Sequence, residues 1–167
     1  TAQEAEDFTL KMLKIYEEVY RDTLAIPPVV GRKTEKEKFA GAEASYTLEP
    51  MMHNGVALQG GTTHYFGDGF AKAFGIQFTG RDNALQNPYQ TSWGMSTRLI
   101  GAVIMVHGDD NGLVLPPRVA PVQVVIVPIA QHKPGVLEKA GGLYEELKGQ
   151  FRVKLDSSDN SPGWKFA

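Results

Sequence analysis

The sequence has no cysteine among its 167 residues, so disulfides, thiolate metal sites and cysteine nucleophiles are excluded. It has no long hydrophobic run either. The longest stretch of apolar residues and glycine is the eight residues Leu99 to Val106, whereas a membrane-spanning helix needs roughly 20. The formal net charge is only −2, so no overall positive field favours nucleic acid. We expect a globular protein of a reducing, cytoplasmic compartment, with no membrane association.

Several catalytic motifs are also missing from the sequence. It contains no GxxxxGK[ST] phosphate loop, no HExxH metal motif and no GxSxG nucleophile elbow. The four histidines are scattered along the chain. The residues therefore predict no nucleophilic or metal-centred catalysis.

The first twenty residues have the pattern of an amphipathic helix. Apolar residues recur at steps of three and four: Ala5, Phe8, Met12, Ile15 and Val19. This periodicity predicts that these side chains face the core. Thr1 and Glu4 have the spacing of a capping box, and Pro27-Pro28 stops the helix soon after residue 21.

The middle of the chain has the pattern of an antiparallel sheet. Asn54-Gly55 is a strong hairpin signal between two strand-like segments. We predict a short helix at 70–75, a charged loop or short helix at 32–41, and a loop at 81–88. The predicted strands are residues 27–31, 44–52, 56–66, 76–80 and 89–96.

Two different patterns follow. Residues 97–109 are apolar all round, which predicts a helix buried on most sides. Residues 122–129 form a continuous apolar segment, typical of a strand buried on both faces of a parallel sheet. A helix at 134–149 and a strand at 151–155 would complete a βαβ unit. We place the domain boundary between residues 119 and 120.

The strand at 89–96 has two unlike faces. One face is bulky and mostly apolar: Tyr89, Thr91, Trp93 and Met95. The other is small and polar: Gln90, Ser92, Gly94 and Ser96. Small residues allow a ligand to approach the backbone closely. The alternative is that a helix or a loop of the protein packs there.

Arg98 follows at the edge of the small face. A guanidinium can stack on a planar ring and bind phosphate oxygens, although a salt bridge to a carboxylate would also explain it. The glycine pair Gly60-Gly61 predicts either a β-bulge or a close approach of another group to the backbone. A bulge there would bring Gln59, Thr62 and His64 to one side, although a lone histidine is often structural. The pattern indicates a ligand that lies across the sheet, with a planar or anionic part near Arg98.

Several segments of the sequence resemble a known family. YQTSWGMSTRLIGAVIMVHGDDNGLVLPPRVAP resembles motif 3 of a class II aminoacyl-tRNA synthetase and the passage out of its catalytic domain. KFAGAE, ALQGGTTHYFGDGFAKAF and NSPGWKF resemble the prolyl-tRNA synthetases of the eukaryote-like and archaeal-like branch. The resemblance covers essentially the whole chain. It implies an α+β class II catalytic domain at 1–119 and the first part of an α/β anticodon-binding domain at 120–167.

The resemblance implies an aminoacyl-tRNA ligase that uses ATP and Mg²⁺. Proline would react with ATP to give prolyl-adenylate and pyrophosphate, and the prolyl group would pass to tRNA(Pro). The expected partners are proline, ATP, tRNA(Pro) and a second copy in a homodimer.

The matching motifs imply a nucleotide-binding set of four residues. Arg98 would stack on adenine, and Ser96 would also touch the nucleotide. Gln59 and Thr62 would bind ATP, with Gln59 near a magnesium ion. No catalytic side chain is expected, because chemistry of this kind depends on positioning and on charge stabilisation.

The matching motifs also imply a proline-binding set. His64 would help to hold the amino acid, and Phe39 would form a wall of the pocket. Ser92 and Gly94 would form its floor, and Trp93 would anchor the strand from behind.

The sequence departs from the family pattern at both ends. Motifs 1 and 2, which supply the dimer interface and an arginine for the α-phosphate, are missing, and TAQEAEDF resembles the residues just after motif 2. We therefore expect a fragment that is inactive in isolation. Two alternatives remain open: another class IIa synthetase, for threonine, glycine or histidine, or a non-catalytic synthetase-like binding module.

Overall fold

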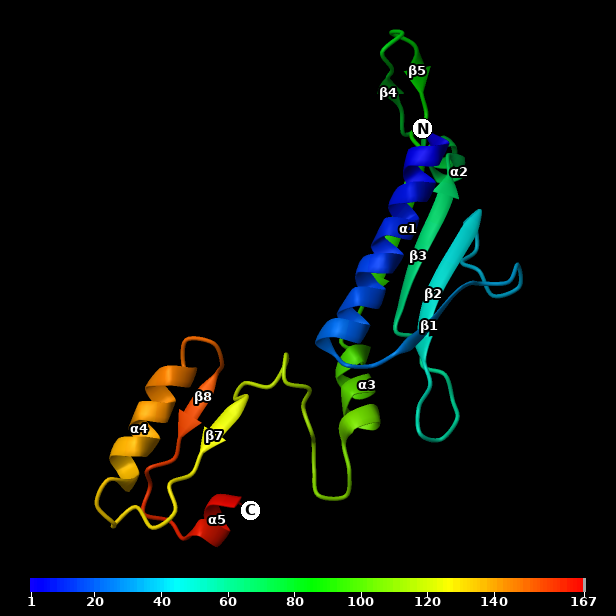
Figure 1. Ribbon diagram of the computed structural model, residues 1–167. Coiled ribbons are helices and arrows are strands. Elements are labelled where there is room, and N and C mark those ends of the chain that lie inside the picture. Colours follow the sequence, from blue (N-terminus) through cyan, green and yellow to red (C-terminus); the bar gives the residue numbers. More distant parts are fainter. Residues whose placement is uncertain (167) are drawn as a thin grey trace. The chain divides into compact units, whose positions relative to one another are not determined.

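The computed structural model describes residues 1–166, which form two compact units, Thr1–Pro116 and Pro117 onward. Figure 1 shows the helices and strands of each unit. We describe each unit by itself. The expected boundary between residues 119 and 120 stays a prediction.

The first unit begins with the expected helix. The α-helix α1 spans Ala2–Glu18 and continues as the π-helical turn η1, Val19–Thr23. The capping box is confirmed, because the Thr1 hydroxyl accepts a hydrogen bond from the Glu4 backbone N–H and the Glu4 side chain bonds back to the cap.

The predicted buried face of this helix is only partly right. Of the expected stripe, Ala5 is buried, but Phe8 is 41% exposed. The residues that are buried instead are Thr9, Leu13 and, in η1, Tyr20. The Thr9 hydroxyl lies 2.6 Å from that of Thr91 and 2.8 Å from the Ala5 carbonyl oxygen. Because these bonds satisfy the hydroxyl, a polar residue is tolerated where the periodicity predicts an apolar one.

Four antiparallel strands form the sheet of the first unit, in the order β1-β2-β3-β6. Their bounds are β1 Pro28–Arg32, β2 Ala44–Pro50, β3 Gly61–Gly67 and β6 Gln90–Met95. The hairpin at Asn54-Gly55 is confirmed as the β2–β3 connection, although β3 begins at Gly61 rather than at residue 56. Helix α1 packs on one face of this sheet, against β2, β3 and β6 (Figure 1).

Shorter elements complete the first unit. The predicted helix at 70–75 is confirmed as α2, Gly69–Phe74. The strand predicted at 76–80 is only β4, Phe78–Thr79, and it pairs with β5, Leu85–Gln86, inside the segment predicted as a loop. Residues 32–41 contain turns and no helix.

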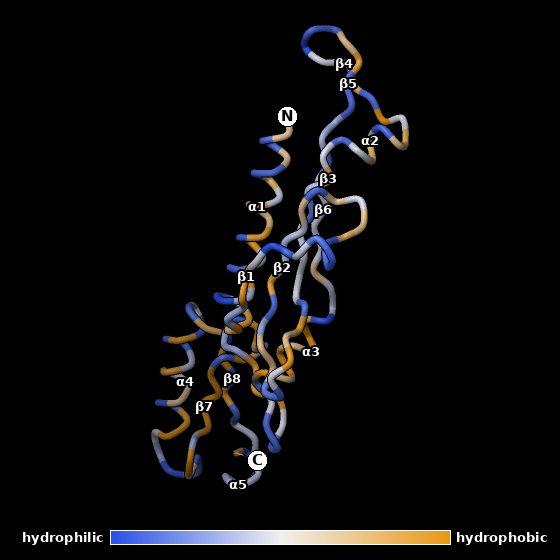
Figure 2. Tube along the Cα trace, turned by 90° about the vertical axis from the view of Figure 1, so that its right-hand side faces the viewer, coloured by the Kyte–Doolittle hydropathy of each residue, from blue (hydrophilic) through white to orange (hydrophobic). Residues whose placement is uncertain are grey.

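Helix α3, Arg98–His107, confirms the helix predicted after β6. Its expected burial is wrong: only Ala102 and Val103 are buried, and Ile100 is 63% exposed. The apolar character of α3 is visible in Figure 2. The apolar sequence of α3 would allow burial on all sides, but the described residues cover only one side of this helix.

The second unit contains the predicted βαβ arrangement. Strands β7, Val124–Ile126, and β8, Val153–Leu155, are parallel, and helix α4, Val136–Leu147, connects them. A short helix α5, Pro162–Phe166, follows. The long strand predicted at 122–129, buried on both faces, is wrong in extent and burial, since β7 has three residues and Val125 is 54% exposed. A two-stranded sheet has no third strand to extend the ladder.

Within the second unit, hydrogen bonds from Arg152 hold the segment that precedes β7. The Arg152 guanidinium, beside β8, donates hydrogen bonds to the carbonyl oxygens of Pro117, Arg118 and Ala120, at 2.9–3.0 Å. In the part of the chain that the structure describes, no helix is long and apolar enough to cross a membrane.

Candidate functional site

The candidate site is the face of the four-stranded sheet that α1 does not cover. Side chains alternate along each strand, so residues paired across the strands share a face. Two neighbouring rows cross this face: Thr47, Thr62 and Gly94 in one, and Ser45, His64 and Ser92 in the next. The rows are two residues apart, which is about 7 Å along a strand. The small face predicted for residues 89–96 therefore lies on this open side.

One end of the face forms a hollow of about 240 Å³. We call it the Arg98 hollow, and it is lined by Gln59, Gly60, Gly61, Thr62, Gly94, Met95, Ser96 and Arg98. It contains all four residues of the predicted nucleotide-binding set. Sequence segments that are about 35 residues apart meet here because β3 and β6 pair in register.

Arg98 extends from the first turn of α3 over this hollow. Its Nη1 donates a hydrogen bond to the Gln59 backbone oxygen at 3.2 Å, and its backbone N–H lies 3.3 Å from Ser96 Oγ. The side chain is exposed and, within residues 1–166, forms no ion pair with a carboxylate. The structure therefore does not contain the salt bridge that was the alternative explanation of Arg98. The guanidinium group is available to a ligand.

The bulge predicted at Gly60-Gly61 is confirmed. Between the pair Leu48–Gly61 and the bridge Met51–Ala57, the strand with the glycines has one residue more than β2, and the Gly60 N–H donates to the carbonyl oxygen of Leu48 at 2.9 Å. A second register shift, between β3 and β6, lies between Tyr65 and Gly67. A Cβ at Gly60 would collide with the Tyr20 ring, and one at Gly61 would lie 2.9 Å from Met95 Cγ. The pair is therefore glycine because side chains of the covered face approach the backbone. The extra residue brings Gln59 to the side of Thr62, and both residues line the Arg98 hollow.

The other end of the face is an aromatic group that we call the His64 cluster: Phe39, Ser45, His64 and Phe66. The Phe39 ring centroid lies 5.2 Å from that of His64 and 5.7 Å from that of Phe66. Ser45 Oγ lies 2.8 Å from His64 Nδ1 and accepts a hydrogen bond from the Phe39 backbone N–H at 3.1 Å. These contacts place Phe39 beside His64, as the proline-pocket prediction requires, and Ser92 lies opposite His64 in the ladder.

Electrostatics favour a neutral imidazole in this cluster. Burial, and the nearby Lys33 ammonium, lower the pKa of His64. The Ser45 hydroxyl oxygen accepts a hydrogen bond from the Phe39 backbone N–H, so the hydroxyl proton can be donated to His64 Nδ1. We assign the His64 proton to Nε2 on this basis, which leaves an N–H donor for a ligand.

This pKa shift predicts a specific pH dependence of stability. An unfolded histidine has a pKa near 6.5, so below that pH the unfolded state binds more protons than the folded state. Acidification from pH 7.5 to 5.5 should therefore lower the urea midpoint of the wild-type protein more than that of His64→Asn. His53→Asn, in the exposed β2–β3 turn, is the matched control and should follow the wild type. Parallel pH curves for wild type and His64→Asn would contradict the assignment.

Trp93 lies on the opposite face from the other predicted site residues. Its ring packs edge-on against Phe8 of α1, with centroids 5.1 Å apart. This placement suits the predicted role of anchoring β6 from behind. It does not suit direct contact with a ligand on the open face.

Three residues of the open face were missed by sequence reasoning. Ser45 is on the same face as His64 and holds its imidazole. Phe66 has the strand parity of Thr62 and His64 and extends the His64 cluster. Lys33 follows β1, and its Nζ lies 2.6 Å from Gln59 Oε1. Strand parity in residues 44–50 and 61–67 is a signal for the first two, but no local pattern predicts the Lys33 contact.

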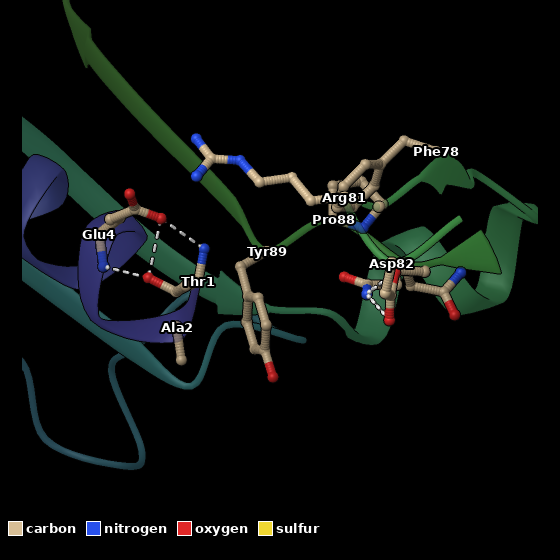
Figure 3. A pocket seen from close by; sticks show the side chains of 11 residues that line it. Thr1, Ala2, Glu4, Phe78, Arg81, Asp82, Pro88 and Tyr89 are labelled. Carbon is tan, nitrogen blue, oxygen red and sulfur yellow. Dashed lines mark hydrogen bonds and ion pairs between the residues drawn. The ribbon is translucent and has the colours of Figure 1, made fainter. Parts of the chain in front are cut away.

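A larger hollow, of about 780 Å³, lies between the first residues of α1 and the β4–β5 connection (Figure 3). It contains none of the predicted site residues. We therefore place the candidate site at the smaller hollow, which contains all four residues of the predicted nucleotide-binding set.

Comparison with known proteins agrees with this geometry. Residues 1–107 match the family model described as the tRNA synthetase class II core domain (G, H, P, S and T). The chain belongs to the class II tRNA synthetases. The open face of this synthetase core contains the residues of both predicted binding sets except Trp93. Residues 123–167 match a second family model, described as an anticodon binding domain, and this range includes the βαβ unit.

Three similar curated proteins share one printed name. The chain is 64% identical over 167 residues to the "Proline--tRNA ligase" of Ruminiclostridium cellulolyticum, 68% to that of Lachnoclostridium phytofermentans and 59% to that of Clostridium botulinum. In each case the match covers 100% of this chain and 35% of the relative. The chain therefore spans about a third of the length of these class II synthetases.

Proposed function

We propose that this chain forms part of a proline--tRNA ligase, an enzyme that uses ATP to attach proline to tRNA(Pro). The observation that carries the proposal is the arrangement of one open sheet face in a class II synthetase core. The Arg98 hollow lies at one end of this face, and the His64 cluster lies about two residues farther along the strands. The printed name of the relatives supports proline as the amino acid.

The reaction has two steps. A proline carboxylate oxygen attacks the α-phosphorus of ATP, the bond to the β-phosphate oxygen breaks, and pyrophosphate leaves. A ribose hydroxyl of tRNA then attacks the prolyl carbonyl carbon and AMP leaves. Neither step needs a nucleophilic side chain, so the protein contributes mainly alignment and charge stabilisation.

The two ends of the face match the two substrates of the first step. Arg98 provides a planar cation for stacking on the adenine ring or for binding phosphate. Gln59, Thr62 and Ser96 offer the Arg98 hollow an amide and two hydroxyl groups. At the other end, Phe39 and His64 give an apolar wall and an N–H donor for proline. A spacing of about 7 Å between the rows allows the prolyl part and the nucleotide part of one adenylate to bind side by side.

Magnesium does not fit the residues around Gln59 as a resident ion. Gln59 Oε1 already accepts a hydrogen bond from the Lys33 ammonium, and a dication would be repelled there. Mg²⁺ prefers carboxylate and phosphate oxygens, and residues 1–166 contain no group of three or more His, Asp or Glu that could hold a metal ion. We therefore treat Mg²⁺ only as the counter-ion that ATP brings with it.

The remaining expectations belong to the same proposal. The match of the second unit to an anticodon binding domain supports tRNA as the partner. A homodimer and a cytoplasmic location stay predictions.

Amino-acid-dependent exchange of labelled pyrophosphate into ATP tests the proposed function. The full-length protein that contains this chain should exchange with proline and not with threonine, glycine or histidine. The 167 residues alone should give no exchange above background, because the Arg98 hollow is small and open on its own. Exchange with another amino acid, or none in the full-length protein, would contradict the proposal.

A further inference from the structure

Lys33 lies on the open face but was not among the predicted site residues. It follows β1 and continues its pairing with β2, since its backbone N–H donates to the Ser45 carbonyl oxygen at 2.8 Å. Strand alternation places its side chain on the face of Ser45 and His64. From there its Nζ crosses β2 to reach Gln59 Oε1 at 2.6 Å. The ammonium group therefore lies at the border of the Arg98 hollow and the His64 cluster.

The charge of this ammonium group is not balanced by the protein. Lys33 is half-buried, yet among the described residues it forms no ion pair within 4.0 Å, and its recorded side-chain partner is the neutral amide of Gln59. Glu49 belongs to the same face, but its carboxylate accepts from the Thr47 hydroxyl at 2.9 Å. The bond to Gln59 is exposed, so the ammonium group can exchange this neutral partner for an anion, with which it forms a stronger, charge-assisted hydrogen bond.

Arg98 makes the same contact from the other side. Its guanidinium donates to the backbone oxygen of Gln59, and Lys33 donates to the side-chain oxygen of the same residue. Two cations without carboxylate partners therefore meet at one glutamine. This arrangement concentrates positive potential at the border of the hollow, which attracts a polyanion and repels a metal ion.

We propose that the Lys33 ammonium binds the polyphosphate of ATP and the departing pyrophosphate, and that Gln59 holds it in position. The inference rests on the proposed function. Lysine is a recurrent point-charge ligand of phosphate, and its flexible stem allows the ammonium to move from Gln59 to a phosphate oxygen. The charge that develops on the leaving pyrophosphate would be stabilised at the place where the ammonium group lies.

A contact with the proline carboxylate is the competing role for Lys33. The observed partner decides between them: Nζ bonds to Gln59, which lines the Arg98 hollow, rather than to Ser45 or His64. The phosphate role predicts an effect on ATP and pyrophosphate, and the carboxylate role predicts an effect on proline.

The test compares Lys33→Met, Lys33→Arg and Lys36→Met in the full-length enzyme. A charge-assisted hydrogen bond is worth enough to change an equilibrium by about tenfold or more. Lys33→Met should therefore raise the KM for ATP and the inhibition constant of inorganic pyrophosphate by about tenfold, and leave the KM for proline within about twofold. Lys33→Arg should retain most of the binding, and Lys36→Met, at an exposed position of the following turn, should behave as wild type.

Each outcome is informative. Unchanged constants for ATP and pyrophosphate in Lys33→Met, or a rise confined to the KM for proline, would overturn the proposal. If Lys33→Met lowers the melting temperature, Lys33→Gln replaces it, and a melting temperature equal to wild type with weak pyrophosphate inhibition would support the charge role. Absence of proline-dependent exchange in the wild-type enzyme would instead refute the proposed function, so the two failures are distinguishable.

Discussion

Replacing Arg98 by alanine in the full-length enzyme is expected to remove about 2–4 kcal/mol of transition-state stabilisation, which is roughly 30- to 1,000-fold in kcat/KM for ATP. The physical reason is the position of Arg98. Its guanidinium extends over the Arg98 hollow, held by the Gln59 carbonyl oxygen, and no carboxylate of the described residues neutralises it. Steady-state pyrophosphate exchange with varied ATP measures the effect.

Two further variants make the Arg98 result specific. Arg98→Lys should restore little activity, because stacking on a ring needs the planar guanidinium group. Arg21→Ala is the matched control, since Arg21 is an exposed arginine of the same unit that pairs with Glu17 at 2.9 Å. Such surface pairs contribute about 0–1 kcal/mol. Normal ATP kinetics in Arg98→Ala would disprove its assignment to the nucleotide.

Gly94→Val should abolish binding of a prolyl-adenylate analogue while leaving the fold intact. Gly94 is exposed on the open face, and a Cβ at this position would meet no atom within 4 Å. The valine side chain would therefore enter the Arg98 hollow, which has a volume of only about 240 Å³. Because valine is well accommodated in β-strands, the free energy of unfolding should change little. Isothermal titration calorimetry and thermal melts measure the two quantities separately.

Gly61→Val supplies the opposite result as a control. Gly61 lies across the ladder from Met95, and a Cβ there would lie 2.9 Å from Met95 Cγ and 3.2 Å from Tyr16 Cδ2. Overpacking of this kind costs about 1–3 kcal/mol, so this variant should lose stability. If Gly94→Val binds the analogue normally, the open face is not the ligand face. If it melts as early as Gly61→Val, the face is packed against protein.

Local signals in the sequence predicted most of the elements. The capping box of Thr1 and Glu4, the turn at Asn54-Gly55 and the βαβ pattern all depend on residues that are near in the chain. For that reason each can be identified without knowledge of the tertiary structure. The two faces of residues 89–96 were predicted for the same reason, and β6 has its bulky face toward α1, where Trp93 contacts Phe8.

Predictions that depended on distant neighbours failed. The buried stripe of α1 was predicted from hydrophobicity alone, yet Thr9 is buried because Thr91 satisfies its hydroxyl. Burial of α3 was predicted from its composition, although burial depends on what packs against a helix.

The sequence by itself determined where most of the helices and the main strands lie, which face of β6 is small, and that Arg98 stands at its edge, because spacing and side-chain size are properties of neighbouring residues. Only the tertiary structure decided that Gln59, Thr62, Ser96 and Arg98 line one hollow, that Ser45 holds His64, and that Lys33 reaches Gln59 across a strand. Those contacts depend on strand order and register. Because register is a property of paired strands, no single segment contains the information that sets it.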